Sequence, residues 1–345
     1  MKRIHIGHHF FGSGNLGDDF VLSALLSALK DKAVRYSCCV PYDLATLKLR
    51  YPQIEWKPYT HESRSEAIQG CDLWLGLGGS PFQSEVSNWF IKHLSDEATL
   101  CSRFNKEMFF LGIGGQDAKA YTNEDIGQIM SRASAIWTRD DATYEALQKQ
   151  KANVFLGADL SHALFDECLP PAATPGRLTA ALNFDYKQWS NLPDLIQTLE
   201  ALSPKERVWM IQESRDIPGA EKALFKLLPD KLQALWKQRL SDQPAQAIRQ
   251  VIAAWPSGEW LLSSRYHTTL ASAWSGSKAV VIETNLKLKS AALECGYSSL
   301  SSDATPEEVL NALLKAEAPS IQRLKERALL ARAAIHQFCA LAEIT

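Results

Sequence analysis

The chain has 345 residues, of which 46% are hydrophobic and 22% are charged, and its formal net charge is -2. A chain of this length exceeds what one hydrophobic core usually serves, so we expect two domains. The near-neutral charge gives no bulk electrostatic reason to bind nucleic acid or an anionic membrane surface. No uncharged apolar run approaches the ~20 residues that span a bilayer.

The N-terminus predicts no signal peptide, because it enters a strand and a glycine turn without an apolar segment or a small-residue cleavage site. The seven cysteines are scattered, odd in number and form no C-x-x-C pair. Reduced core residues are therefore favoured over disulfides or metal ligands. Together these features predict a cytoplasmic protein.

Short apolar runs alternate with helical stretches through the first half of the chain. Strands are predicted at residues 2–7, 34–40, 73–77, 108–113, 135–138 and 153–156, and the clearest helices at 18–30, 85–104, 124–133 and 141–150. Strands that alternate with helices imply βαβ units and a parallel sheet.

The strongest break in the chain is Leu169-Pro-Pro-Ala-Ala-Thr-Pro-Gly176, which predicts a linker between a domain of residues 1–168 and one of residues 177–310. The second domain is predicted to hold strands at 179–183, 208–212, 260–262 and 278–282, and helices at 243–255, 268–275 and 287–295. Thr305-Pro306-Glu307-Glu308 is a capping-box start. Residues 311–345 are predicted to end in a basic helix, about 319–341, that can pack across both domains. Two such domains predict a cleft with the site between them.

A glycine-rich loop, Gly12-Ser13-Gly14-Asn15-Leu16-Gly17, follows the first predicted strand and matches the G-x-G-x-x-G pattern of dinucleotide sites. Asp18 and Asp19 follow at once and would repel a pyrophosphate. The acidic residue that binds a ribose about 20 positions further on is also not evident. We therefore favour a turn beside a polar substrate and keep a NAD site as the alternative.

Two further glycine loops follow predicted strands, Gly76-Leu77-Gly78-Gly79-Ser80 and Gly112-Ile113-Gly114-Gly115. Glycine lets a ligand approach the backbone closely, although a purely structural turn explains either loop equally well. The carboxyl ends of parallel strands meet at one edge of a sheet. Three such loops therefore predict one ligand-facing rim.

Two arginines also follow predicted strands. Arg139 lies in Thr138-Arg139-Asp140-Asp141, where an aspartate is expected to cap the next helix. Arg265 lies in Ser264-Arg265-Tyr266-His267, at the start of a helix, where unpaired N–H groups favour anions. An isolated Arg-x-His is more often structural. The second arginine and the glycine loops make ligand binding the better interpretation.

No metal or cofactor site is predicted. His5, His8 and His9 fit structural or substrate-contacting roles better than zinc, because His5 sits inside a strand and the others begin a loop.

Read in chain order, these motifs resemble the polysaccharide pyruvyl transferase family. The resemblance spans about residues 4–300 and is carried by residues 14–19, 76–80, 112–115, 138–140, Asp159, 264–267, 275–280 and Lys287. The chain departs from the family pattern at Gly79-Ser80-Pro81, at Gly115-Gln116 and at Glu283-Thr284-Asn285. The last two departures bear on the acceptor more than on the chemistry.

The resemblance implies a GT-B-like α/β fold, with two Rossmann-like domains whose parallel sheets face a cleft. It implies transfer of a pyruvyl group from phosphoenolpyruvate to two hydroxyls of a sugar, with release of phosphate. Arg139 and Arg265 are expected to hold the donor's anionic groups, and His267 to protonate its methylene carbon. The expected substrate-binding residues are Asn15, Gly17, Asp18, Asp19, Gly78, Gly79, Ser80, Gly114, Ser264 and Lys287. Of these, Asp18 or Asp19 is expected to bind the acceptor hydroxyl and Lys287 the departing phosphate.

The expected acceptor is a glycan or its lipid-linked precursor, so any membrane contact is expected to be peripheral and at the inner face of the cell membrane. A GT-B-type glycosyltransferase that uses a nucleotide sugar is the alternative. An acidic ribose ligand in the second domain would favour it, and Glu283 and Glu294 are the candidates. A non-catalytic glycan-binding protein is a third hypothesis, which the presence of Arg139, Arg265 and His267 disfavours.

Overall fold

A computed structural model describes residues 1–7, 11–81, 89–115, 123–150, 153–183, 191–212, 220–240 and 247–345 of the chain. The chain divides into two compact units. Unit 1 comprises Met1–Gly12, Asp18–Leu164 and Arg327–Thr345, and unit 2 comprises Ser13–Gly17 and Phe165–Glu326. The sequence, in contrast, predicts three continuous segments, residues 1–168, 177–310 and 311–345.

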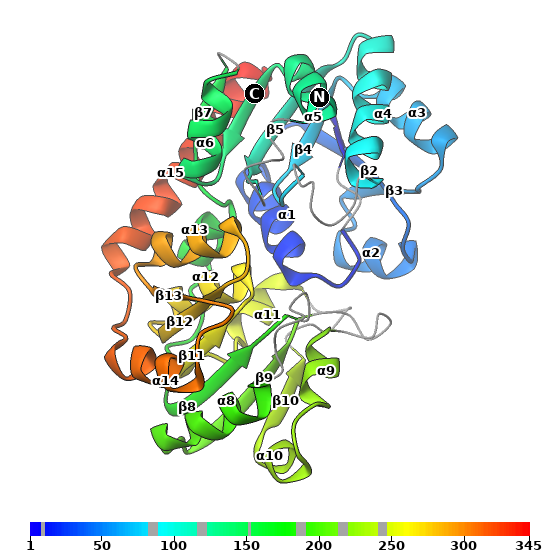
Figure 1. Ribbon diagram of the computed structural model, residues 1–345. Helices are drawn as coiled ribbons and strands as arrows, with labels where there is room; N and C mark the ends of the chain where they lie inside the picture. The colour runs from blue at the N-terminus through cyan, green and yellow to red at the C-terminus, as the bar shows by residue number, and fades with distance from the viewer. Residues whose placement is uncertain are drawn as a thin grey trace. The chain divides into compact units, whose positions relative to one another are not determined.

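Unit 1 is built on a 7-stranded parallel sheet in the order β3-β2-β1-β4-β5-β6-β7 (Figure 1). Its strands are β1 (Lys2–Ile6), β2 (Val34–Val40), β3 (Ile54–Pro58), β4 (Leu73–Leu77), β5 (Glu107–Ile113), β6 (Ala135–Thr138) and β7 (Val154–Leu156). The order reverses between β1 and β4, and open α/β sheets bind ligands beyond the carboxyl ends of the strands at such a reversal.

The helices of unit 1 follow its strands in alternation, as the sequence predicts. They are α1 (Leu16–Ala28), α2 (Leu44–Arg50), α3 (His61–Gly70), α4 (Trp89–Arg103), α5 (Glu124–Arg132) and α6 (Asp141–Gln148), with α7 (Ser161–Glu167) at the boundary with unit 2. Side chains that accept hydrogen bonds from the first helical N–H groups fix several starts, among them Asp43, Thr60, Asn123 and Asp140. The predicted residues 85–88 of α4 lie outside the described residues.

The last helix, α15 (Ile321–Leu341), contributes to the core of unit 1 from Arg327 onward. Phe338 is fully buried and packs edge-on against Trp137, with ring centroids 6.0 Å apart. Trp137 Nε1 donates a hydrogen bond to Gln337 Oε1 at 3.0 Å. The aromatic contacts therefore join the end of the chain to the strand that precedes Arg139.

Unit 2 repeats the arrangement with a 6-stranded parallel sheet in the order β10-β9-β8-β11-β12-β13. Its strands are β8 (Thr174–Ala181), β9 (Glu206–Ile211), β10 (Lys237–Leu240), β11 (Gly258–Ser263), β12 (Lys278–Glu283) and β13 (Ser298–Ser301). Its helices are α8 (Leu192–Leu199), the 3-10 turn η3 (Glu200–Leu202), α9 (Ala220–Phe225), α10 (Asp230–Leu235), α11 (Ile248–Ala253), α12 (Tyr266–Trp274), α13 (Leu286–Cys295) and α14 (Pro306–Lys315). The order reverses between β8 and β11, the strand that precedes Arg265.

The predicted linker is wrong at its end, because β8 already begins at Thr174. Gly176 adopts a φ of 73°, which only glycine reaches without strain, and the pairing of β8 with β11 shifts register between Gly258 and Trp260. This irregularity lets a proline and a glycine occupy the start of a strand. The capping box of α14 is confirmed. The backbone N–H of Glu308 donates to the side chain of Thr305, and the backbone N–H of Thr305 donates to the side chain of Glu308.

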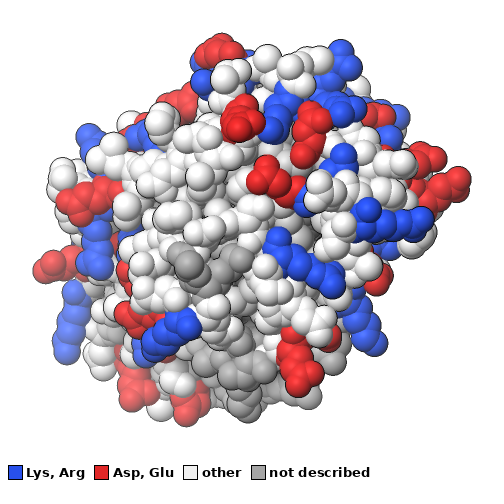
Figure 2. Space-filling model, turned by 90° about the horizontal axis from the view of Figure 1, so that it is seen from above, with Lys and Arg blue, Asp and Glu red and all other residues white. Residues whose placement is uncertain are grey.

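All seven cysteines are free, and all but Cys168 are buried, so six of them lie in the core as predicted. No helix in the described part of the chain combines the length and the apolarity that a membrane span would require. Acidic and basic side chains are interspersed on the face seen in Figure 2.

Candidate functional site

The loops at the carboxyl ends of β4, β5 and β6 are joined by backbone hydrogen bonds in unit 1. Gly114 N donates to Gly79 O at 3.0 Å, and Arg139 N donates to Ile113 O at 2.8 Å. Because the three strands are neighbours in the sheet, both glycine loops and Arg139 lie at one edge. The structure therefore brings these predicted residues together, and their role in binding stays a prediction.

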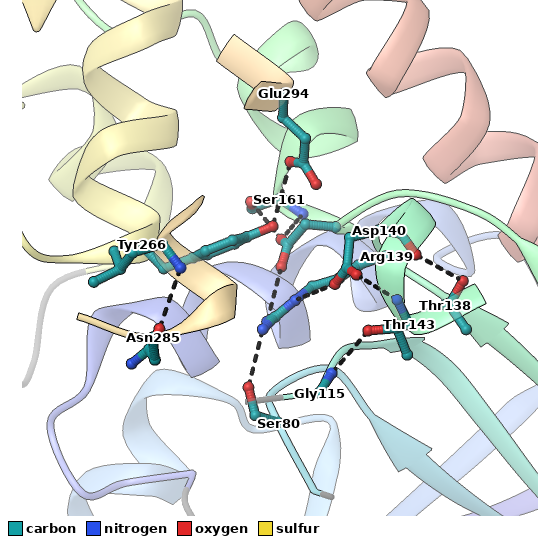
Figure 3. A network of polar contacts seen from close by, with 12 residues as sticks. Ser80, Gly115, Thr138, Arg139, Asp140, Thr143, Ser161, Tyr266, Asn285 and Glu294 are labelled. Atoms are coloured by element: carbon teal, nitrogen blue, oxygen red, sulfur yellow. Dashed lines mark hydrogen bonds and ion pairs between the residues drawn. The ribbon is translucent and has the colours of Figure 1, made fainter. Parts of the chain in front are cut away.

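Arg139 is buried within this edge, with only 1% of its surface exposed. Its Nη2 donates to Ser80 Oγ at 2.9 Å, while Nε lies 3.8 Å from Asp140 Oδ2 and Nη1 lies 3.8 Å from Asp159 Oδ2 (Figure 3). A Cβ atom at Gly114 would lie 2.4 Å from Arg139 Nε, so only glycine lets the β5 loop lie against the guanidinium.

Both aspartates beside Arg139 are fixed by hydrogen bonds of their own. Asp159 Oδ1 accepts from Ser161 N at 3.0 Å and from Ser161 Oγ at 2.6 Å. Asp140 Oδ1 accepts from Thr143 N at 2.8 Å, as the predicted helix cap. A buried cation between two buried carboxylates costs several kcal/mol if one member is removed, so Arg139 serves the fold of this edge.

The residues at the start of α1 are held by hydrogen bonds. Asn15 Oδ1 accepts from Gly17 N at 3.2 Å and so satisfies one of the first helical N–H groups. Asp19 Oδ2 accepts from Arg50 Nη1 at 3.0 Å, and its Oδ1 accepts from the hydroxyl of Tyr51 at 2.9 Å. Burial and then the charge of Asp19 raise the pKa of Tyr51 well above its usual range.

Asp18 differs from Asp19 in its surroundings. The carboxylate of Asp19 is 2% exposed and engages Arg50 and Tyr51, the last residue of α2 and the residue after it, which gives it a structural role. Asp18 is 9% exposed, and its charge adds to burial in raising the pKa of Tyr42. Binding of an acceptor by Asp18 stays a prediction.

Ser264 connects the two strands at the reversal point of unit 2. It is 3% exposed, its hydroxyl accepts a hydrogen bond from Asn183 N at 2.7 Å, and its own N–H donates to Ala181 O at 2.9 Å. These contacts tie the end of β11 to the end of β8. Ser264 thus fixes the course of the chain just before Arg265.

Arg265 is the N-cap residue of α12, and both its backbone and its side chain are held. Its N–H donates to Ser263 Oγ at 3.1 Å, and its carbonyl accepts from Thr269 Oγ1 at 2.8 Å. The guanidinium Nη2 donates to the carboxylate of Glu221, which is fully buried, whereas the side chain of Arg265 is 14% exposed. Among the described residues, the Glu221 carboxylate contacts the guanidinium of Arg265, and the carboxylates of Asp140 and Asp159 lie within 4 Å of that of Arg139.

His267 is a half-buried residue in the first turn of α12. Its ring packs edge-on against that of Tyr266, with centroids 5.0 Å apart, and the Tyr266 hydroxyl donates to buried Glu294 at 3.3 Å. A Cβ atom at Gly17 would lie 2.0 Å from His267 Nδ1. The segment Ser13–Gly17, which belongs to unit 2, therefore lies directly against His267 and joins the first motif to the last.

Lys287 lies in the first turn of α13, which has no acidic residue there. Asn285 caps this helix by accepting from Leu288 N at 3.2 Å. A cation at a helix N-terminus is opposed by the helix dipole, so local helix stability does not explain a lysine at this position. The position is consistent with the predicted phosphate contact, which stays a prediction.

The sequence did not indicate Glu221, which lies 44 residues before Arg265 in a helix of ordinary composition. His5 proves to be structural: its Nδ1 lies 3.0 Å from Ser37 Oγ, and burial, aided by the charges of Lys57 and Arg64, lowers its pKa to about 3. His8 and His9 lie outside the described residues. Within the described ranges, no group of three or more His, Cys, Asp or Glu side chains is arranged to hold a metal ion.

Solved structures identify the class of fold. UDP-GlcNAc 2-epimerase from Methanocaldococcus jannaschii is similar over 98% of this chain and 99% of its own, with a TM-score of 0.63 and 12% identity. The Neisseria meningitidis UDP-GlcNAc 2-epimerase, solved with UDP-GlcNAc, gives a TM-score of 0.59 at 8% identity over 99% of both chains. Anabaena Alr3699/HepE, solved with UDP and glucose, gives 0.56 at 12% identity over 98% of this chain and 95% of its own. The chain therefore has a GT-B-type fold of two Rossmann-like units, as predicted.

The family follows from the sequence. The family model described as polysaccharide pyruvyl transferase matches residues 15–285, so the chain belongs to this family, as the resemblance implied. The matched region begins at Asn15 and ends at Asn285, and it includes both arginines and His267. No curated protein matches the chain as a whole sequence.

Proposed function

We propose that the chain transfers the pyruvyl group of phosphoenolpyruvate to two hydroxyls of a glycan sugar, forming a cyclic ketal and releasing phosphate. The observation that carries this proposal is the Ser264–His267 segment at the carboxyl edge of β11. There an arginine held by a buried carboxylate stands two residues before a histidine in the first turn of a helix. Membership of the pyruvyl transferase family supports the same chemistry.

Arg265 is proposed to bind an anionic group of the donor. A guanidinium presents parallel N–H groups that match the two oxygens of a carboxylate or phosphate. The side chain is 14% exposed, so it is shielded from water while keeping access to a ligand. The N–H groups at the start of α12 add positive potential at the same edge, because they have no partner within the helix.

His267 is proposed to deliver a proton to the methylene carbon of the donor. The carbon–carbon double bond then becomes a methyl group beside a cationic C2, which one sugar hydroxyl attacks as it loses its proton. The C2–phosphate bond breaks, and the second hydroxyl closes the ketal. One hydroxyl proton restores the acid and the other leaves with the phosphate. General acid catalysis of this type typically contributes ~10²–10⁴-fold.

The other predicted residues are proposed for supporting roles. Lys287 would lower the charge of the departing phosphate, and a contact of Asp18 with the acceptor stays a prediction. Arg139, buried against Ser80, Asp140 and Asp159, would hold the glycine loops of unit 1 in place. A direct contact between Arg139 and the donor stays a prediction.

The test combines turnover with isotope placement. Purified protein, phosphoenolpyruvate and a panel of lipid-linked and nucleotide-linked sugars should release phosphate and yield one sugar heavier by a pyruvate ketal. In D₂O the methyl group of that ketal should carry one deuterium, because the proton comes from an exchangeable group. Failure to bind phosphoenolpyruvate, with no mass gain across the panel, would refute the proposal.

The alternative is a glycosyltransferase that uses a nucleotide sugar, and one solved relative of the same fold carries UDP and glucose. That activity would need a carboxylate for the ribose. Glu294 is 1% exposed and accepts a hydrogen bond from the Tyr266 hydroxyl, and Glu283 accepts one from the Ser299 hydroxyl. Both predicted candidates therefore already bind a hydroxyl of the protein. Stabilisation against heat by UDP, without stabilisation by phosphoenolpyruvate, would favour this alternative.

A further inference from the structure

We propose, on the basis of the function just described, that Glu221 is a positioning residue that fixes the guanidinium of Arg265 for the donor. Glu221 does not itself touch substrate in this account. It determines which N–H groups of Arg265 are occupied and in which direction the guanidinium points. Nothing in the sequence motifs assigns a role to this residue.

The backbone of Glu221 is held by the core of unit 2. The residue is fully buried on α9, and its backbone carbonyl accepts from Trp209 Nε1 at 2.9 Å. Trp209 is itself fully buried and packs edge-on against Trp236 and Phe225, with centroids 5.8 and 5.5 Å away. The position of Glu221 is therefore set by the core of unit 2.

Arg265 is held independently at its other end. The hydroxyls of Ser263 and Thr269 bind its backbone N–H and carbonyl. With the backbone and Nη2 both fixed, few rotamers of a long side chain remain. An arginine that is ordered before its ligand arrives loses less conformational entropy on binding.

Stability alone is a weak reason for this pair. A buried ion pair repays its desolvation only with excellent geometry, and apolar residues of similar volume often serve the fold as well. Orientation is a stronger reason, because small misplacements of a binding group reduce turnover steeply.

The first test measures phosphoenolpyruvate turnover by Glu221→Ala and Glu221→Gln. Loss of a charged hydrogen bond should lower kcat/KM roughly 10- to 100-fold in Glu221→Ala. Glu221→Gln should lose less, because its amide oxygen still accepts from Nη2, and it tests the proposal if the alanine variant does not fold. The matched control is Glu206→Gln, which breaks the Arg177–Glu206 pair of the same unit and should stay within about 2-fold.

The second test asks whether Glu221 acts through Arg265. In an Arg265→Ala background, adding Glu221→Ala should change kcat/KM by less than about 3-fold, because coupled residues are not additive. A further drop as large as in the wild-type background would overturn the proposal. So would a glutamine variant no better than the alanine variant.

A ligand-independent measurement separates this inference from the proposed function. Absence of ketal formation by the wild-type protein would count against the proposed function alone. Labelling with the arginine reagent phenylglyoxal, followed by peptide mass analysis, then decides the role of Glu221. Faster modification of Arg265 in Glu221→Gln than in wild type is expected, and equal rates would overturn the proposal.

Discussion

The two arginines that end strands, Arg139 in unit 1 and Arg265 in unit 2, follow the same sequence pattern but occupy different environments. Arg139 is 1% exposed, lies 3.8 Å from each of two carboxylates and donates to a serine hydroxyl. Arg265 is 14% exposed and pairs with the carboxylate of Glu221.

The difference in burial and contacts favours a structural role for Arg139 and a ligand-binding role for Arg265. An anion approaching Arg139 would meet two carboxylates, whose repulsion at short range opposes binding. The side chain of Arg265 is 14% exposed, which leaves access for an anion, and the Glu221 carboxylate that it contacts is fully buried. We therefore propose that Arg139 orders the glycine loops and that Arg265 binds the donor.

The largest expected effect is on chemistry at the edge of unit 2. His267→Ala should lower kcat by about 10²–10⁴-fold, because it removes the proposed proton donor. His336→Ala, on the exposed face of α15, is the control and should leave kcat unchanged. Steady-state phosphate release measures both. Unchanged turnover in His267→Ala would contradict the role of His267 as proton donor and the placement of the chemistry in unit 2.

Arg139→Met should have its main effect on stability. Removing the cation leaves two buried carboxylates uncompensated, so the free energy of unfolding should fall by about 3–5 kcal/mol. Arg327→Met is the control, because that arginine pairs at 3.3 Å with Asp141, whose side chain is 62% exposed, and exposed pairs contribute at most about 1 kcal/mol. Denaturant titration compares the two, and similar values would contradict the structural role of Arg139.

A second buried charge in unit 1 extends the comparison to pH. Glu97 is 4% exposed and accepts from Trp74 Nε1 at 2.9 Å, and burial raises its pKa from 4.5 to about 7. The protonated form is favoured in the folded state, so stability that is present below pH 4.5 is lost as pH rises to about 7. Relative to Glu97→Gln, the wild type should lose on the order of 3 kcal/mol over this interval. A difference that is flat with pH would refute this assignment.

Arg265→Lys should have the smallest effect on the fold and a selective effect on the donor. Lysine keeps the charge but loses the paired N–H groups, so KM for phosphoenolpyruvate should rise about 10-fold. The unfolding free energy should fall less than in Arg139→Met, because Glu221 keeps a cationic partner. A large loss of stability with an unchanged KM would show that Arg265, like Arg139, has a structural role, and would contradict donor binding.

The sequence predicts the central strands well because they are buried runs of apolar residues. All of Leu73–Leu77 is buried, and its predicted bounds agree with the structure. The edge strands β3, β10 and β13 were not predicted, since IEWKP, KQRL and SSLS are short and partly polar. Such segments gain their order from a neighbouring strand rather than from their own pattern.

The candidate site was predictable only where it depends on local sequence. Strand ends, glycine turns and the cap formed by Asp140 follow from neighbouring residues. The burial of Arg139 and the engagement of Asp19 by Arg50 depend on contacts between distant segments, as does the pairing of Arg265 with Glu221. Similar motifs can therefore serve the fold in one unit and the ligand in another.

A crystal structure with phosphoenolpyruvate soaked into the protein tests the central claim most directly. The account predicts a carboxylate or phosphate of the donor within hydrogen-bonding distance of the Arg265 guanidinium, with Arg139 still bound to Ser80. An anion bound to Arg139 in place of Ser80, with none at Arg265, would contradict it.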